Sequence, residues 1–152
     1  MNANLFILFL SVILHSCKAK PDFEKEKQEI MKIHNNQRKA HMEKNVPLLI
    51  GDSLIEFFEI NRGLIKKPSR EESIKKFQEY FNAVDFVKWD DISAPIFSFS
   101  EDATMATTVV NKLVITKQKA ENKLDTTYYA WLAVYKKKNG VWQMERMAST
   151  TK

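Results

Sequence analysis

Two histidines, His34 and His41, stand seven residues apart in a stretch that has no glycine or proline between Phe23 and about Lys44. Glu, Lys and Gln dominate this stretch, so it is expected to form a long helix capped by Asp22. Its rise separates the two histidine Cα atoms by about 10 Å, which is too far for a shared metal ion. No clustered carboxylates complete a site, so we expect neither a metal nor a cofactor.

The helix face that carries these histidines changes character halfway along. It begins with Phe23, Ile30 and Ile33 and continues with His34, Gln37 and His41. A face that turns polar either lines a cavity or reaches solvent, and the pattern leaves both open. His34, Gln37 and His41 are therefore ligand-binding candidates. His41 is the best candidate for a base or hydrogen-bonding group in a pocket. Alternatively, it is a core histidine whose hydrogen bonds are satisfied within the protein.

Trp89-Asp90-Asp91 places an aromatic ring beside two acids, where a strand is expected to be interrupted. Two nearby carboxylates shift each other's pKa and could act with His41 as an acid/base set. Adjacent strand residues face opposite ways, so at most one of the two carboxylates would enter a pocket. Bonding of these acids to turn amides is the favoured alternative. Trp89 is a further ligand-binding candidate.

Arg62 lies in an expected turn, Asn61-Arg62-Gly63, after a short strand that begins at Phe57. Its guanidinium could hold a ligand carboxylate. The favoured alternative is an ion pair with Asp90, Asp91 or Glu56.

The stretch from Thr126 to Thr150 predicts a β-hairpin. Two aromatic and branched runs flank Asn139-Gly140, a pair that supplies the positive φ angles of a type I′ turn. Tyr129 and Trp131 share one face of the first strand, where they could line a cavity or pack in the core. Both are retained as ligand-binding candidates.

The remaining elements follow from local signals. Pro47–Leu54 is too short to assign between helix and strand by periodicity. Ser69 and Glu72 form a capping box before a helix that runs to about Asn82. Further strands are expected from Phe86, over Ile96–Phe99 and over Met105–Ile115, followed by a polar loop over Lys119–Asp125. Consecutive strands without intervening helices indicate an α+β domain with an antiparallel sheet.

Length and composition suggest a single domain with a sizeable core. The chain has 152 residues, of which 44% are hydrophobic, and a formal net charge of +5. Its lysines are dispersed, and no arginine-rich or aromatic-basic motif occurs. We therefore expect no nucleic-acid partner.

The N-terminus resembles the leader of a bacterial lipoprotein. An apolar run from Leu5 to Leu14 has the length of a signal-peptide core and precedes Leu14-His15-Ser16-Cys17. The alternatives are a secretory leader cut elsewhere and a cysteine that ends up buried. We expect residues 1–16 to be a signal peptide, Cys17 to be acylated, residues 17–21 to be a tether, and residues 22–152 to be the domain. The protein would then be exported and anchored to the cell envelope through Cys17.

The order of elements resembles the nuclear transport factor 2-like (NTF2-like) superfamily, within its SnoaL-like, ketosteroid-isomerase-like branch. The resemblance spans residues 22–150 and is carried by Ala40-His41, Asn61-Arg62-Gly63, Pro68–Glu72, Tyr80-Phe81, Trp89–Ile92, Ala94-Pro95, Asp102 with Met105-Ala106, and Trp131–Trp142. It implies a strongly curved sheet wrapped around a long first helix, with two further helices and a cone-shaped pocket. It also favours a helix at Pro47–Leu54.

The chain departs from these relatives in two ways. Ala103 follows Asp102 where many of them have glycine, and the tyrosine and aspartate set of ketosteroid isomerases is absent. We therefore expect the cone to bind a small molecule without catalysis. The alternatives are an isomerase, hydrolase or dehydratase that uses His41 with Asp90 or Asp91, and a homodimer or partner-binding module.

Overall fold

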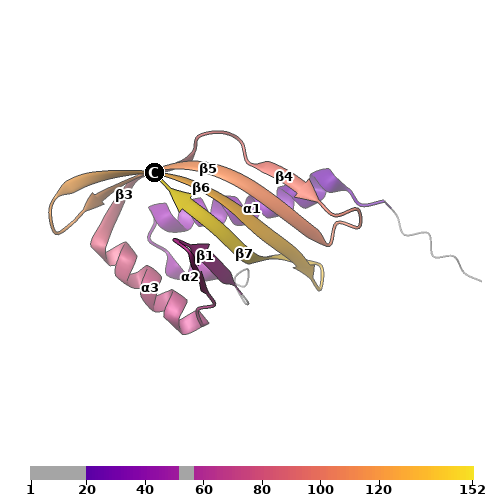
Figure 1. The fold of residues 1–152 in the computed structure, drawn as a ribbon, viewed down its shortest axis with the longest axis horizontal. Helices are drawn as coiled ribbons and strands as arrows, with labels where there is room; N and C mark the ends of the chain where they lie inside the picture. The colour runs from indigo at the N-terminus through magenta and orange to yellow at the C-terminus, as the bar shows by residue number, and fades with distance from the viewer. Residues whose placement is uncertain (1–19, 52–56) are drawn as a thin grey trace, which may run out of the picture.

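The structure is a computed structural model that describes residues 20–51 and 57–152, so the predicted leader and Cys17 lie outside it. The described residues form three helices and seven strands. In order these are α1 (Phe23–Met42), α2 (Val46–Ile50), β1 (Phe58–Asn61), β2 (Leu64–Lys66), α3 (Arg70–Ala83), β3 (Val84–Asp91), β4 (Ile96–Phe99), β5 (Met105–Gln118), β6 (Lys123–Lys138) and β7 (Val141–Thr151). The predicted α+β fold is confirmed, with α1 running along one face of the sheet (Figure 1).

Side-chain caps define where the helices begin. The Asp22 carboxylate accepts a hydrogen bond from the Lys25 amide at the start of α1. Asn45 caps α2 in the same way, and α2 confirms the first part of the helix expected over Pro47–Leu54; residues 52–54 lie outside the described residues. Ser69 and Glu72 make both hydrogen bonds of the predicted capping box at α3. These bonds satisfy amide groups that have no partner inside the helix.

The sheet has the order β2-β1-β7-β6-β5-β3, and β4 also pairs with β5. All its pairs are antiparallel except β1 with β7, so the predicted antiparallel sheet is in fact mixed. Tight turns force consecutive strands to pair antiparallel. β1 and β7 are far apart in the sequence, so no turn sets their relative direction.

The hairpin predicted near the C-terminus is formed by β6 and β7. Asn139 and Gly140 have φ angles of 51° and 80°, both positive, as a type I′ turn requires. Two predictions about where strands break are wrong: the interruption at Asp90-Asp91 and the loop over Lys119–Asp125. β3 continues through Asp90 and Asp91, and β6 begins at Lys123, because both segments pair with β5. Backbone pairing with a neighbouring strand overrides the polar character of these side chains.

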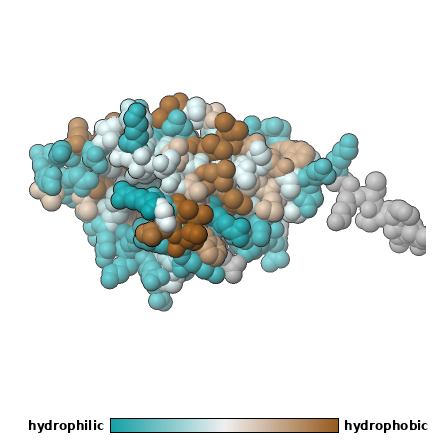
Figure 2. Space-filling view, viewed as in Figure 1, coloured by the Kyte–Doolittle hydropathy of each residue, from teal (hydrophilic) through white to brown (hydrophobic). Residues whose placement is uncertain are grey.

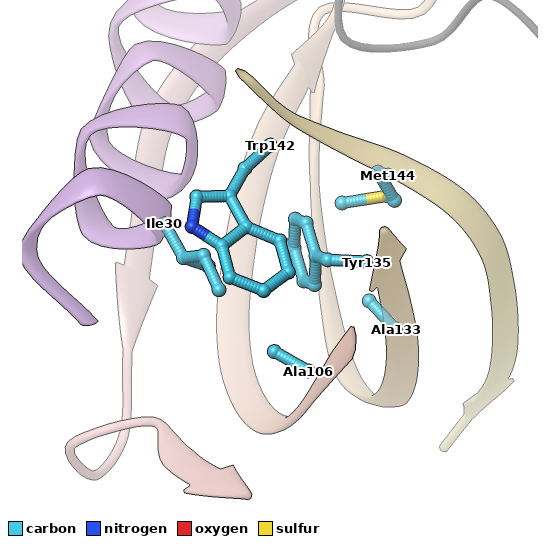
Figure 3. Packing of buried hydrophobic residues seen from close by; sticks show 6 residues of the cluster. All are labelled: Ile30, Ala106, Ala133, Tyr135, Trp142 and Met144. Carbon is cyan, nitrogen blue, oxygen red and sulfur yellow. The ribbon is translucent and has the colours of Figure 1, made fainter. Parts of the chain in front are cut away.

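The first half of α1 packs tightly on the sheet. Figure 3 shows the Trp142 indole between Ile30 of α1 and Tyr135 of β6. The buried cluster consists of Ile30, Ala106, Ala133, Tyr135, Trp142 and Met144. The Glu26 carboxylate joins the same region, accepting hydrogen bonds from Lys137 Nζ at 2.6 Å and Trp142 Nε1 at 2.7 Å. We call this part of the helix–sheet layer the closed end.

Candidate functional site

A cavity of about 380 Å³ opens at the other end of α1, which we call the open end. It lies between the second half of α1, the middle of α3 and the inner face of the sheet. Its lining residues are Gln37, His41, Glu59, Asn61, Lys76, Phe77, Tyr80, Trp89, Val114, Tyr129, Trp131, Met147 and Ser149. A volume of this size is typical of a small-molecule site.

Aromatic rings make up much of the cavity wall. The His41 ring stacks on Trp89, with centroids 4.3 Å apart and planes inclined by 17°. The ring centroids of Trp131 and Trp89 are 6.1 Å apart, and those of Phe77 and His41 are 6.4 Å apart with the two planes nearly perpendicular. Rings arranged in this way offer flat apolar surface that suits a planar ligand.

His41, which forms part of this wall, is a neutral ring. Its Nδ1 lies 2.7 Å from the Gln37 carbonyl oxygen, which can only accept a hydrogen bond. Nδ1 therefore carries the proton. Burial lowers the pKa of His41 to about 4, so Nε2 keeps its lone pair at neutral pH. His41 is consequently a hydrogen-bond acceptor and a weak base.

Polar side chains lie among the aromatic ones, and they include the amides of Gln37 and Asn61 and the hydroxyl of Ser149. The Lys76 ammonium pairs with the Glu59 carboxylate at 2.8 Å. Burial raises the pKa of Tyr129, and it raises that of Tyr80 to about 12. Both phenols therefore stay protonated at neutral pH and can donate hydrogen bonds to an oxygen atom of a ligand.

Behind the wall lies a charge cluster formed by the buried His34 and Lys112 side chains and the partly exposed Asp91 carboxylate. His34 Nε2 is 2.8 Å from Asp91 Oδ2, and Lys112 Nζ is 2.6 Å from Asp91 Oδ1. Lys112 is 0% exposed and lies directly opposite Asp91 in the β3–β5 register. Its ammonium sits 3.7 Å from the centre of the Trp89 ring and 5.7 Å from that of Trp131. The cluster thus fixes α1 to two strands and supports both tryptophans.

Burial and ion pairing shift the pKa of each of these three groups in opposite directions. Burial lowers the pKa of His34 more than Asp91 raises it. Burial raises the pKa of Asp91, but hydrogen bonds from Lys112 and His34 outweigh it, so this pKa is lowered overall. Burial also lowers the pKa of Lys112, against the pull of Asp91. Asp91 is thereby held as a carboxylate.

The predicted ligand-binding residues fall into two groups. Gln37, His41, Trp89, Tyr129 and Trp131 line the cavity. His34 is 5% exposed and points to Asp91 instead. Arg62 lies beside a separate hollow of about 200 Å³ along the β1–β2 hairpin.

The acid/base set of His41 with Asp90 or Asp91 is not formed. Asp91 pairs with His34 and Lys112, and Asp90 with Arg38 at 2.8 Å. The expected bonds from these acids to turn amides are also wrong, because both residues belong to β3. Arg62 makes no ion pair with either acid, and Glu56 lies outside the described residues.

Several lining residues escaped the sequence analysis, as did Lys112. Lys112 occupies an inward position of β5, in phase with Ala106, Val110 and Val114. This alternation could have placed it inside, but it gives no sign of its partner across the strand. Glu59, Phe77 and Tyr80 come from elements whose position relative to α1 only the fold defines.

Across residues 20–51 and 57–152, no three His, Cys, Asp or Glu side chains gather as a metal-ion site would require. No helix in the same ranges combines the length and apolar character needed to cross a membrane.

Comparison with known proteins supports the fold. No family model and no curated protein matches the sequence. A ketosteroid isomerase-like protein from Erwinia carotovora atroseptica superposes with a TM-score of 0.68 at 17% identity, covering 85% of this chain and 98% of that one. A hexachlorocyclohexane dehydrochlorinase from Novosphingobium barchaimii superposes with a TM-score of 0.69 at 11% identity, covering 86% of this chain and 88% of that one.

An NTF2-like protein from Cytophaga hutchinsonii gives a TM-score of 0.66 at 14% identity, covering 83% of this chain and 98% of that one. The fold is therefore that of the NTF2-like proteins, as the sequence resemblance implied. At these identities the likeness concerns the fold alone.

Proposed function

We propose that this NTF2-like domain binds a small, planar, partly apolar molecule in the open-end cavity without transforming it. The observation that carries the proposal is a cavity of about 380 Å³ that combines a wall of His41, Trp89 and Trp131 with polar side chains from α1, α3, β1, β6 and β7. Such a mixture of apolar wall and polar groups is characteristic of small-molecule sites.

The polar groups suggest what the ligand carries. The Tyr80 and Tyr129 phenols are donors, while the neutral His41 ring offers an acceptor nitrogen. A flat ring bearing a hydroxyl or carbonyl oxygen would match both the wall and these groups. Lys76 is already paired with Glu59, so it gives little preference for an anionic ligand.

An isomerase, hydrolase or dehydratase is the second candidate. It is supported by the dehydrochlorinase and the ketosteroid isomerase-like protein among the structures with this fold. Such chemistry needs a base poised near the working pH. His41 lies in the cavity but has a pKa of about 4, while the His34–Asp91 pair lies behind the wall. Binding therefore has the stronger support.

We also propose that the domain is displayed on the cell envelope, anchored by an acylated Cys17. The support is the apolar run Leu5–Leu14 followed by Leu14-His15-Ser16-Cys17. The test is membrane fractionation of a Cys17→Ser variant. Release into the soluble fraction is expected, and continued membrane association would contradict acylation as the anchor.

The binding proposal is tested with two neighbouring residues of β7. Ser149 lines the cavity, whereas Thr150 is exposed on the opposite side of the strand. Ser149→Phe should fill the cavity, and Thr150→Phe is the matched control. Isothermal titration calorimetry would measure binding of 2-naphthol and indole, two flat rings with one polar group each.

We expect the parent chain and Thr150→Phe to bind at least one of these rings with the same affinity. Ser149→Phe should weaken that binding by at least about tenfold, since it removes the space the ring needs. Equal binding by Ser149→Phe would show that the rings bind elsewhere and would contradict the assignment of the cavity. Conversion of a bound compound into a product would favour the catalytic candidate.

A further inference from the structure

The floor of the open-end cavity continues onto the β1–β2 hairpin. Met147 of β7, which lines the cavity, lies beside Glu59 of β1, and Glu59 lies opposite Lys66 of β2. Asn61 lies opposite Leu64 in the same way. Directly paired residues point to the same side of a sheet. The side chains of Lys66 and Leu64 therefore share the face that carries the cavity.

The hollow of about 200 Å³ beside Arg62 lies on this face of the hairpin. Its lining residues are Glu59, Asn61, Arg62, Leu64 and Lys66. Glu59 and Asn61 also line the cavity, so the hollow and the cavity adjoin along β1. Neighbouring strands lie about 4.8 Å apart, and β1 is separated from β6 by β7 alone. A ligand that stacks in the cavity can thus extend a substituent into the hollow.

Positive charge is in excess in the hollow. The Glu59 carboxylate is already paired with Lys76 Nζ at 2.8 Å. Across residues 20–51 and 57–152, neither Arg62 nor Lys66 has an ion-pair partner. Both side chains are exposed to water. Two cations without a counter-charge therefore line the hollow, and their combined field attracts an anion.

Apolar residues of the hairpin lie on its opposite face. Phe58, Ile60 and Ile65 alternate with the lining residues along β1 and β2. Figure 2 shows hydrophobic residues gathered on this outer side of the sheet. Lys67 belongs to the same side, because its Nζ lies 5.2 Å from the centre of the Phe58 ring. Lys66 and Lys67 are neighbours in the sequence, yet only Lys66 lines the hollow.

The charge of Arg62 also acts on the cavity itself. Burial raises the pKa of the Tyr129 phenol and the charge of Asp125 raises it further, whereas the charge of Arg62 lowers it. Tyr129 lines the cavity, so the Arg62 guanidinium is close enough to act on a group bound there. Asp125 is the opposing charge, and it belongs to β6, two strands away from β1 in the sheet.

We propose that the ligand of the open-end cavity is a planar acid whose carboxylate lies in the hollow against Arg62 and Lys66. The inference rests on the proposed binding function and adds the charge of the ligand to it. A guanidinium offers two parallel N–H donors to a carboxylate, and the Lys66 ammonium adds another donor. Because the hollow is open to water, the carboxylate keeps part of its hydration there, so its desolvation costs little.

The test compares 6-hydroxy-2-naphthoate with its methyl ester, which has the same rings but no charge. Isothermal titration calorimetry of the full chain at low ionic strength would measure both affinities for the parent chain, Arg62→Gln and Lys66→Gln. Lys67→Gln is the matched control, because it removes the same charge from the other side of the hairpin. Circular dichroism would verify that each variant folds.

We expect the parent chain to bind the acid at least about tenfold more tightly than the ester. Arg62→Gln and Lys66→Gln should each weaken binding of the acid at least about threefold and leave binding of the ester unchanged, while Lys67→Gln should change neither.

Equal affinities of the parent chain for the acid and the ester would overturn this inference and leave the binding proposal intact. Acid binding that survives in both Arg62→Gln and Lys66→Gln, or that falls as much in Lys67→Gln, would do the same. Failure of both compounds to bind the parent chain would overturn the inference together with the binding proposal.

Discussion

The closed and open ends of the molecule use the same helix and the same sheet, yet at one end Trp142 packs between them, and at the other a cavity of about 380 Å³ separates them. At the closed end, Trp142 occupies the space between Ile30 and Tyr135 (Figure 3). The Glu26 carboxylate also ties α1 to the hairpin by accepting a hydrogen bond from Trp142 Nε1. At the open end, Gln37 and His41 face a cavity instead. Packing at Ile30 thus gives way to a cavity at His41 within about three turns of α1.

The difference arises from where each end has its core. The closed-end cluster joins α1 to the sheet, whereas the second cluster joins helices to one another. That cluster consists of Ala40, Val46, Leu49, Ile50 and Phe81, contributed by α1, α2 and α3. At the open end, contacts among the three helices therefore supply the packing, and the space between α1 and the sheet stays unfilled. A protein can leave space under a sheet when neighbouring elements supply the packing.

The largest expected contrast comes from the tryptophans of the two ends. Trp142→Ala should lower the free energy of unfolding by about 4 kcal/mol, since this ring is only 3% exposed and belongs to the closed-end cluster. Trp131→Ala should lower it by only about 1–2 kcal/mol, because one side of that ring already faces the cavity. Urea unfolding measures both values. Equal losses would show that the open end is as tightly packed as the closed end.

The charge cluster of His34, Asp91 and Lys112 should give the next effect. Asp91→Ala leaves the fully buried Lys112 ammonium without its counter-charge and should destabilise the fold by about 3 kcal/mol. Asp90→Ala is the control on the same strand, and its loss should stay below about 1 kcal/mol because the Asp90–Arg38 pair is exposed. Chemical denaturation of the two variants tests this. A similar loss for both would mean that Asp91 is not a structural anchor.

The two ends should also respond to different pH ranges. Burial lowers the pKa of His41 from 6.5 to about 4, so between these values the unfolded chain binds more protons than the folded one. Stability should therefore fall as the pH falls through this range, by about 2 kcal/mol between pH 7 and pH 5. His34, whose pKa burial also lowers, acts in the same direction.

The closed end should be insensitive over that range. Hydrogen bonds from Lys137 and Trp142 hold the pKa of Glu26 below 4.5 against the effect of burial, so its contribution is lost only at lower pH. Urea unfolding of the parent chain and of His41→Phe at pH 7 and pH 5 separates the two ends. The variant should lose most of the pH dependence, and an unchanged profile would exclude His41 as its source.

The smallest contrast concerns one ion pair at each end. Lys137→Met removes an ammonium that lies 2.6 Å from both Glu26 oxygens and should lower the unfolding free energy by about 1–2 kcal/mol. Lys76→Met breaks the pair with Glu59 at the mouth of the cavity, where the lysine side chain is 56% exposed. Its loss should be under about 1 kcal/mol. Thermal melts of both variants check this order, and a larger loss for Lys76→Met would reverse it.

Much of the fold could be predicted because its signals are local. The capping box at Ser69, the Asn139-Gly140 turn and the uninterrupted helix from Phe23 each act within a few residues. The interruption expected at Asp90-Asp91 failed because pairing with β5 holds these residues in the strand. The direction of β1 beside β7 likewise depends on residues far apart in the sequence.

The candidate site shows the same division. The sequence by itself determined that α1 has a face that changes from Ile30 to Gln37 and His41, and that Tyr129 and Trp131 share one side of β6. Only the tertiary structure decided that Lys112 meets Asp91, that His41 stacks on Trp89, and that α3 stands far enough away to leave a cavity. Periodicity records which way a side chain points, whereas its partner depends on contacts between strands and helices that no local pattern encodes.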